Sequence, residues 1–146
     1  MRATQRNTRQ REVVLEELRR LGTHPTAAEL YEIARARLPK ISLGTVYRNL
    51  ELLAENGIIQ KLKISGAEAR FDGDPQRHYH VCCVRCGRVD DVHDLPRNFV
   101  RRRAKQLSGY DILGFRLEFN GICPECKKRS APGSDEGASQ EKDRAV

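Results

Sequence analysis

Four of the five cysteines are spaced as a zinc site requires. They form two Cys-x-x-Cys pairs, Cys83 with Cys86 and Cys123 with Cys126. Two intervening residues allow a tight turn to aim both sulfurs at one ion, and four thiolates complete a closed tetrahedral zinc site. Two disulfides or four ordinary buried cysteines are the alternatives, but a disulfide within such a pair closes a strained loop, and a core has no reason to space cysteines in pairs. Because a zinc ion with four protein ligands has no open position, we expect this site to be structural.

A His-x-His pair just before the first Cys-x-x-Cys pair could hold a second metal ion. Residues i and i+2 of a strand share a face, so His78 and His80 can bind one ion while Cys83 faces the other way. The further candidate ligands are Asp72, Asp91 and, more distantly, His24. Imidazoles with carboxylates suit Fe(II), Mn(II) or Zn(II), whereas ordinary surface histidines and solvated carboxylates are the alternative.

The fifth cysteine, Cys82, should lie on the same face as the two histidines if the strand is regular. It is then either a soft ligand of the second site or a small buried residue. A reducing compartment keeps all of these thiols available for metal, and no signal peptide or membrane-spanning run is evident. We therefore expect a cytoplasmic protein.

Residues 1–74 predict three helices followed by a hairpin, which is a winged-helix DNA-binding domain with a hinge at its end. The expected helices begin at side chains that can cap a first turn, namely Thr8, Thr26 and Ser42. They end at Gly22, before Pro39 and at Asn56-Gly57. Residues 58–64 and 69–71 predict the two strands of the wing.

The third of these helices carries hydrogen-bonding side chains that could read a DNA groove. We place Thr45, Tyr47, Arg48 and Asn49 on its outer face, where Arg can contact guanine or phosphate and Thr a thymine methyl group. A solvated polar face is the alternative. Upstream, the basic residues Arg2, Arg6, Arg9 and Arg11 predict an arm that contacts phosphates.

Residues 75–130 predict a small α/β domain that contains the zinc ligands. We expect a hairpin over residues 79–84 and 88–92, a helix over 99–107 and a third strand over 113–120. So small a sheet leaves an edge or face for a second copy, which predicts a homodimer. The Gly/Ser/Glu-rich residues 131–146 predict a disordered tail. The fold class is therefore α+β, with a formal net charge of +7 that favours a polyanionic partner.

Taken together, these motifs resemble the ferric uptake regulator family of metal-dependent repressors over about residues 4–130. The resemblance rests on three stretches: SLGTVYRNLELLAENGII, RFDGDPQRHYHVCCVRCGRVDDV and GICPEC. It implies a winged-helix domain, a dimerisation domain with structural zinc, and a regulatory metal at their junction that closes the dimer onto operator DNA. In the family pattern the zinc falls on Cys83, Cys86, Cys123 and Cys126. The regulatory Fe(II) or Mn(II) falls on His24, Asp72, His78, His80 and Asp91. The DNA-contacting places are held by Arg6, Tyr47 and Arg48.

Two positions favour the peroxide-sensing branch of that family. Iron-sensing members generally have Glu where Asp72 and Asp91 stand, whereas both aspartates resemble peroxide-sensing repressors. The implied mechanism is oxidation of a ligand histidine, His24 or His78, at an Fe(II) centre, which releases the repressor from DNA. A sensor of iron or zinc level of the same family is the alternative. Zinc remains a candidate metal because Cys82 could be a soft ligand of the second site.

Two further expectations follow from what the motifs lack. An accessory metal site of many members has a carboxylate and a histidine where this chain has Asn98 and Phe115, so we do not expect that site. We expect no enzyme, because no Gly-x-Ser-x-Gly or phosphate-cradling glycine loop accompanies the His-x-His pair. We likewise expect no small-molecule substrate beyond metal ions and peroxide.

Overall fold

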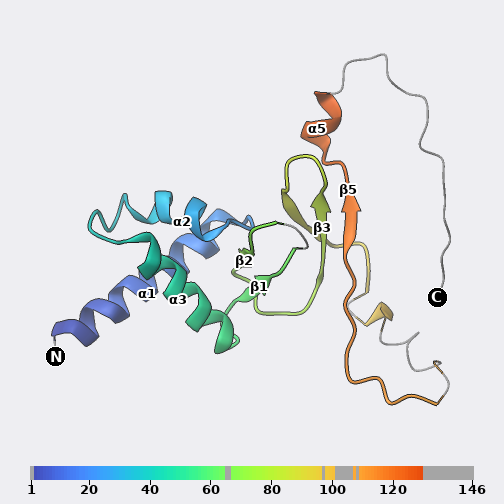
Figure 1. The fold of residues 1–146 in the computed structure, drawn as a ribbon, viewed down its shortest axis with the longest axis horizontal. Helices are drawn as coiled ribbons and strands as arrows, with labels where there is room; N and C mark the ends of the chain where they lie inside the picture. The colour runs from blue at the N-terminus through green and yellow to red at the C-terminus, as the bar shows by residue number, and fades with distance from the viewer. Residues whose placement is uncertain (1, 65–66, 97, 101–106, 108, 130–146) are drawn as a thin grey trace.

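The computed structural model describes residues 2–64, 67–96, 98–100, 107 and 109–129, with side chains from residue 7 onward. The N-terminal half contains three helices and a two-stranded hairpin (Figure 1). Its elements are α1 (Arg2–Leu21), α2 (Ala27–Ala34), α3 (Leu43–Glu55), β1 (Gln60–Leu62) and β2 (Arg70–Asp72). β1 and β2 are antiparallel, so the predicted winged-helix arrangement is present.

Apolar side chains from all three helices and the hairpin form one core. Its fully buried members include Leu18 of α1, Leu30 of α2, Leu50 of α3 and Phe71 of β2. On α3 the buried residues Val46, Leu50 and Leu53 recur at helical spacing, so this face packs against the core and the opposite face is left accessible.

The helix starts follow the predicted caps in two of three cases. The capping box is present before α2, where Thr26 accepts a hydrogen bond from the N–H of Glu29 at 3.2 Å and Glu29 accepts one from Thr26 at 2.9 Å. Ser42 caps α3 by accepting from the N–H of Thr45 at 3.1 Å. The prediction for Thr8 was wrong, because α1 begins at Arg2 and Thr8 lies inside it. No helix breaker separates residues 2–8, so the helix extends through the expected basic arm.

The C-terminal half is built on a three-stranded sheet in the order β4-β3-β5. Its elements are β3 (Tyr79–Cys83), β4 (Val89–Val92), β5 (Phe119–Gly121) and α5 (Pro124–Lys128). β4 is antiparallel and β5 parallel to β3. The hairpin was predicted correctly, but the third strand covers residues 119–121 instead of 113–120, because only that segment pairs with β3. Most of the helix predicted over 99–107, and the whole tail 131–146, lie outside the described residues.

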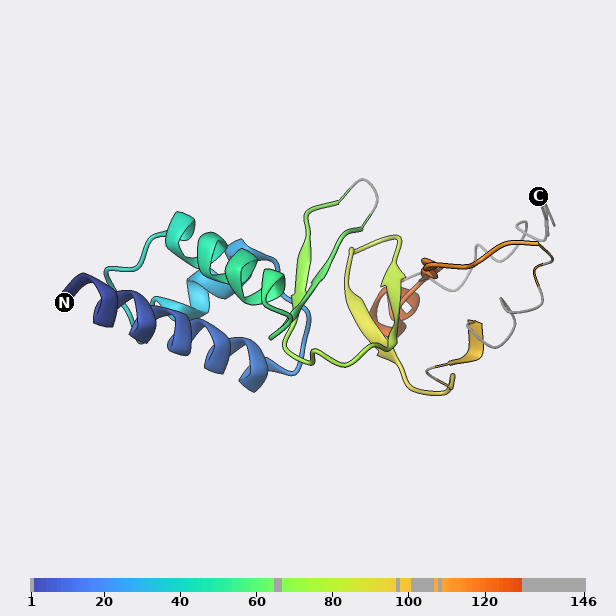
Figure 2. The same cartoon turned by 90° about the horizontal axis from the view of Figure 1, so that it is seen from below.

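The two halves meet along the hairpin β1–β2 and the strands β3 and β4 (Figure 2). Several hydrogen bonds cross this junction, and two of them involve backbone carbonyl oxygens of the strand β4 and of the segment after β1. One joins the His24 ring to the carbonyl oxygen of Val89 at 2.8 Å, and the other runs from Arg116 to the carbonyl oxygen of Lys63. Within the described residues no helix is long and apolar enough to cross a membrane. The mixed helix and sheet content confirms the α+β prediction.

Candidate metal centres and DNA-contacting face

Five predicted ligands come together at the junction of the two halves. His24 and Asp72 come from the N-terminal half, in the turn before α2 and at the end of β2. His78, His80 and Asp91 come from the C-terminal half, just before β3, on β3 and on β4. One potential ligand atom of each lies within 4.8 Å of those of the others. The strand register explains part of this, because His80 is paired directly with Asp91.

The spacing of these atoms fits a metal ion. The six separations between the histidine Nε2 atoms and the aspartate oxygens run from 2.8 to 3.3 Å. Zinc, as an example of such an ion, binds N and O ligands at about 2.1 Å, so two ligands at a right angle lie about 3.0 Å apart. The observed separations therefore match the edges of a coordination polyhedron around a single ion. Three imidazoles with two carboxylates suit Fe(II), Mn(II) or Zn(II).

Backbone carbonyl groups orient two of the three imidazoles. The Nδ1 atom of His24 lies 2.8 Å from the carbonyl oxygen of Val89, and that of His78 lies 2.7 Å from the carbonyl oxygen of Gln76. A carbonyl oxygen only accepts hydrogen bonds, so each Nδ1 must be protonated, and Nε2 is left to face the aspartates. Such carbonyl contacts to metal-binding histidines are the usual second layer of a metal site.

The electrostatics of the cluster also favour a bound cation. Burial lowers the pKa of His24, but the hydrogen bond and charge of Asp72 and the charge of Asp91 outweigh it and raise that pKa above its ordinary value. Burial also opposes protonation of His78, yet its contacts with Gln76 and Asp91 raise its pKa. Burial raises the pKa of Asp72, but hydrogen bonds with its histidine neighbours hold it well below the usual range. The aspartates thus favour positive charge at His24 and His78, and a divalent cation can supply that charge.

Arg70 supports this cluster, and the sequence analysis did not identify it. Its guanidinium donates to the carbonyl oxygen of His24 at 2.8 Å and to the carboxylate of Glu29 at 2.9 Å. Arg70 therefore ties the backbone of His24 to the strand that ends in Asp72. The only signal in the sequence is its position two residues before Asp72, which says nothing about a partner 46 residues away.

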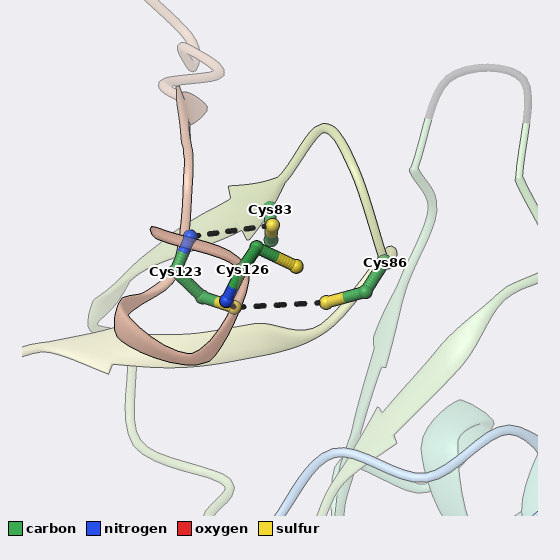
Figure 3. Close-up of side chains that lie close together, drawn as sticks. All are labelled: Cys83, Cys86, Cys123 and Cys126. Carbon is green, nitrogen blue, oxygen red and sulfur yellow. Dashed lines mark hydrogen bonds between the residues drawn. The ribbon is translucent and has the colours of Figure 1, made fainter. Parts of the chain in front are cut away.

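The four paired cysteines also form a cluster, at the far end of the C-terminal half (Figure 3). Their sulfur atoms lie within 4.8 Å of one another, and Cys86 Sγ is 3.7 Å from Cys123 Sγ. This distance is far too long for a disulfide. It matches the edge of about 3.8 Å expected between sulfurs bound at 2.3 Å in a tetrahedral zinc site. The geometry therefore fits structural zinc, as the spacing predicted.

The pKa values of two of these thiols are shifted in opposite directions by their neighbours. Backbone N–H groups of Cys123 and Cys86 donate to Cys83 and lower the pKa of its thiol to about 6. Contact with the Cys123 sulfur, together with burial, raises the pKa of Cys126 to about 12. Four thiolates cannot accumulate in so small a space without a cation, so the site is built to gain its full charge only with metal bound.

The outer face of α3 differs from the prediction at one residue. Thr45, Tyr47 and Arg48 are accessible, and the Tyr47 ring is held edge-on by Phe71 with ring centroids 6.4 Å apart. Asn49 was wrongly placed on this face, because it is only 7% exposed. Its amide donates to the Thr45 carbonyl oxygen at 3.0 Å and accepts from Arg11 at 3.4 Å, so it joins α3 to α1. The side chain of Arg6 lies outside those that the structure describes.

Cys82 is buried and stays apart from the five-residue cluster. It does line a pocket of about 310 Å³ together with His80, so the two share a wall as the strand pattern predicted. Burial, with the nearby Glu118 charge, raises the pKa of its thiol, which disfavours the thiolate that a metal needs. Asn98 and Phe115 line a different pocket, of about 400 Å³, to which neither brings a carboxylate or an imidazole.

A winged helix joined to a zinc-fitting domain, with a second ligand cluster at the junction, defines a metal-responsive DNA-binding regulator. Comparison with known proteins agrees. The sequence model described as "Ferric uptake regulator family" matches residues 2–120. The peroxide-responsive repressor PerR of Staphylococcus epidermidis is 34% identical over 123 residues, which are 84% of this chain and 82% of that protein. PerR of Staphylococcus aureus is 35% identical over 85% of this chain and 84% of its own.

Solved structures show the same fold. The Helicobacter pylori ferric uptake regulator superposes with a TM-score of 0.70 at 25% identity, covering 82% of this chain and 80% of that one. The Campylobacter jejuni peroxide stress regulator gives 0.68 at 27% identity, covering 86% and 94%. The chain belongs to the ferric uptake regulator family, and it is a metal-responsive repressor of that family.

Proposed function

We propose that this protein is a homodimeric repressor that binds operator DNA when its junction cluster holds Fe(II) or Mn(II), and that peroxide ends repression by oxidising a ligand histidine. The observation that carries the proposal is the five-residue cluster, because it draws ligands from both halves of the chain. It acts in the cytoplasm, where reducing conditions preserve the four zinc-binding thiolates.

Metal binding favours the arrangement in which the two halves meet. His24 and Asp72 belong to the winged-helix half, and the other three ligands belong to the sheet of the second half. An ion that needs all five ligands binds this arrangement and not one in which the halves have separated. At a metal concentration 100 times the dissociation constant, such binding stabilises the closed form by about 2.7 kcal/mol.

The closed form presents α3 for DNA. Thr45, Tyr47 and Arg48 lie on its accessible face, and Lys61 of the wing lies 6.0 Å from the centre of the Tyr47 ring. We assign base and phosphate contacts to these side chains and a phosphate contact to Arg6. A two-fold dimer would place two such helices in successive turns of one operator.

A second copy of the chain fits the exposed apolar residues of the C-terminal half. Leu113 is fully exposed and Tyr110 is 80% exposed, and Ile112 and Phe115 beside them are also accessible. Four large apolar side chains within six residues are costly to leave in water and typical of a surface that a partner covers. Structural zinc on the four cysteines then stabilises the dimerisation domain itself.

The ligand set supports peroxide sensing in particular. The regulatory positions carry aspartate at 72 and 91, and the two staphylococcal relatives are named peroxide-responsive repressors. Bound Fe(II) supplies the one-electron chemistry that activates peroxide. A ring carbon of His24 or His78 gains one oxygen atom in place of its hydrogen, and the other peroxide oxygen leaves as water. The modified ring binds metal less well, so the two halves separate and the repressor leaves DNA.

Fluorescence anisotropy of labelled operator-type DNA tests the proposal. We expect zinc-loaded protein to bind DNA tightly with Mn(II) and weakly after Mn(II) removal, with a steep loss on adding salt. Equal DNA binding with and without Mn(II) would refute metal-dependent repression. An iron- or zinc-level sensor is the second candidate, because Cys82 and His80 share one pocket wall. That candidate predicts the same metal dependence with no response to peroxide.

A further inference from the structure

A pocket of about 270 Å³ opens onto the junction cluster from the side of α1. It is lined by three of the five cluster residues, His24, Asp72 and Asp91. The rest of its wall comes from the end of α1 and the turn after β2, including Arg19, Gly73 and Asp74. The cluster therefore has a polar opening to solvent that is separate from the DNA-contacting face of α3.

The carboxylates of this pocket lie at successive depths. The side chain of Asp74 is 50% exposed, that of Asp91 is 29% exposed and that of Asp72 is 8% exposed. An ion that enters from solvent thus meets Asp74 first and Asp72 last. Asp74 is close to the cluster, because its carboxylate lies 3.9 Å from Nδ1 of His78.

Two other pockets reach the cluster, but their charge is unfavourable for a cation. The pocket that touches His80 is lined by Lys61, Lys63 and Arg116 against one acid, Glu118. The pocket that touches His78 is lined by Arg77 and Arg116 and by no acidic residue. Because a cleft lined by one sign of charge concentrates ions of the opposite sign, cations are drawn to the α1 pocket.

Arg19 is the basic residue at the mouth of the α1 pocket. Its Nε atom donates to the Gly73 carbonyl oxygen at 3.4 Å, and its Nη2 atom lies 3.5 Å from the Ile58 carbonyl oxygen. Gly73 packs tightly beneath it, since a Cβ atom there would lie 3.0 Å from Arg19 Cγ. The guanidinium is therefore held beside the turn that carries Asp74, where its charge opposes an incoming cation.

We propose that the α1 pocket is the entrance by which divalent metal ions reach the junction cluster, with Asp74 attracting the ion and Arg19 opposing it. This inference rests on the proposed function only in taking the cluster as a metal site. Neither residue is a ligand, so both act on the rate of entry and not on the final coordination. A carboxylate about 6 Å from a divalent ion in water changes its local concentration about tenfold without salt and about threefold at physiological ionic strength.

Charge-only variants test this. Asp74 accepts a hydrogen bond from the N–H of Gln76 at 2.8 Å, and the amide oxygen of Asp74→Asn can accept the same bond. Arg19→Gln keeps a side-chain donor for the Gly73 carbonyl oxygen while removing the positive charge. The control is Asp90→Asn, which makes the same charge change next to Asp91 in the sequence. Asp90 lies outside the α1 pocket and is paired with Arg88.

The measurement is stopped-flow absorbance of Co(II) binding to zinc-loaded full-length protein, with dissociation measured separately by dilution into a chelator. We expect Asp74→Asn to slow association about tenfold at low ionic strength, Arg19→Gln to accelerate it, and dissociation to change less than about twofold in either. The control should alter association by less than about twofold. Unchanged association in Asp74→Asn, or slower association in both variants, would overturn the proposal.

Failure of the proposed function gives a different pattern. If Co(II) association shows these rate changes but operator affinity is the same with and without metal, the metal-entry proposal is supported and metal-dependent repression is refuted. If DNA binding responds to metal but the variants leave the rates unchanged, repression stands and the entrance is wrong.

Discussion

Removing Nε2 of His24 should weaken metal binding, because this nitrogen is the ligand atom that His24 of the winged-helix half contributes to the cluster. The substitution His24→Asn takes away Nε2 and keeps an N–H group in the place of Nδ1, so the hydrogen bond to the Val89 carbonyl oxygen can persist. His24→Ala would lose both, and an unpaired buried carbonyl would cost about 1–3 kcal/mol of folding free energy. The asparagine variant therefore isolates the ligand role.

The expected size of the effect follows from the contacts of the imidazole. Nε2 of His24 lies 2.9 Å from Asp91 and 3.3 Å from Asp72, so it forms two edges of the proposed coordination shell. Loss of a group that only orients a ligand typically weakens metal binding 10- to 100-fold. Loss of the ligand itself should weaken Mn(II) binding by at least about 100-fold, or about 2.8 kcal/mol.

Free Mn(II) measured by electron paramagnetic resonance during titration gives the affinity directly. His93→Ala is the matched control, because His93 is the one histidine outside the cluster and is exposed. The zinc content of the variant should stay at the wild-type value. Mn(II) affinity within about threefold of wild type in His24→Asn would refute the assignment of His24 as a ligand.

Three other predictions concern the zinc site, pH and DNA. Cys123→Ser should release zinc and unfold the C-terminal half, seen as lost zinc by mass spectrometry and lost cooperative melting, because structural zinc binding is folding free energy. The pKa values of His24 and His78 are raised by their contacts. These contacts therefore stabilise the fold without metal fully below about pH 6.5, and this stabilisation is lost as the pH rises through the raised pKa values. Mn(II) must displace these protons, so its effect on the melting temperature should grow between about pH 6 and pH 8; a constant effect would contradict this. Arg48→Ala should weaken operator binding about 10- to 100-fold, whereas Arg35→Ala, at the exposed residue that caps the end of α2, should leave it unchanged.

Short-range sequence patterns could pair only some of the candidate ligands. The Cys-x-x-Cys spacing and the alternation of a strand act over a few residues, so Cys83 with Cys86, and His78 with His80, could be paired from the sequence. The approach of His24 could not be worked out from such patterns. It depends on the turn between α1 and α2 lying against β4, where the His24 ring meets the Val89 carbonyl oxygen, and only the resemblance to a family implied this.

The errors have the same origin in tertiary packing. Asn49 has the polarity of a surface residue, yet it is buried because Arg11 and the Thr45 carbonyl oxygen satisfy its amide. Thr8 has the side chain of a cap, but the residues before it form helix equally well. The third strand was predicted too long because alternation shows where a strand can form, whereas pairing with β3 decides where it does.

The most direct test of peroxide-sensitive, metal-dependent repression compares two metals in one experiment. Zinc-loaded protein is given Fe(II) or Mn(II) without oxygen, and its operator binding is measured before and after micromolar peroxide, with mass spectrometry of the peptides that contain His24 and His78. We predict loss of DNA binding in the iron form alone, with one added oxygen atom on a histidine. Undisturbed binding in both forms would contradict peroxide sensing and leave a repressor that responds to metal level.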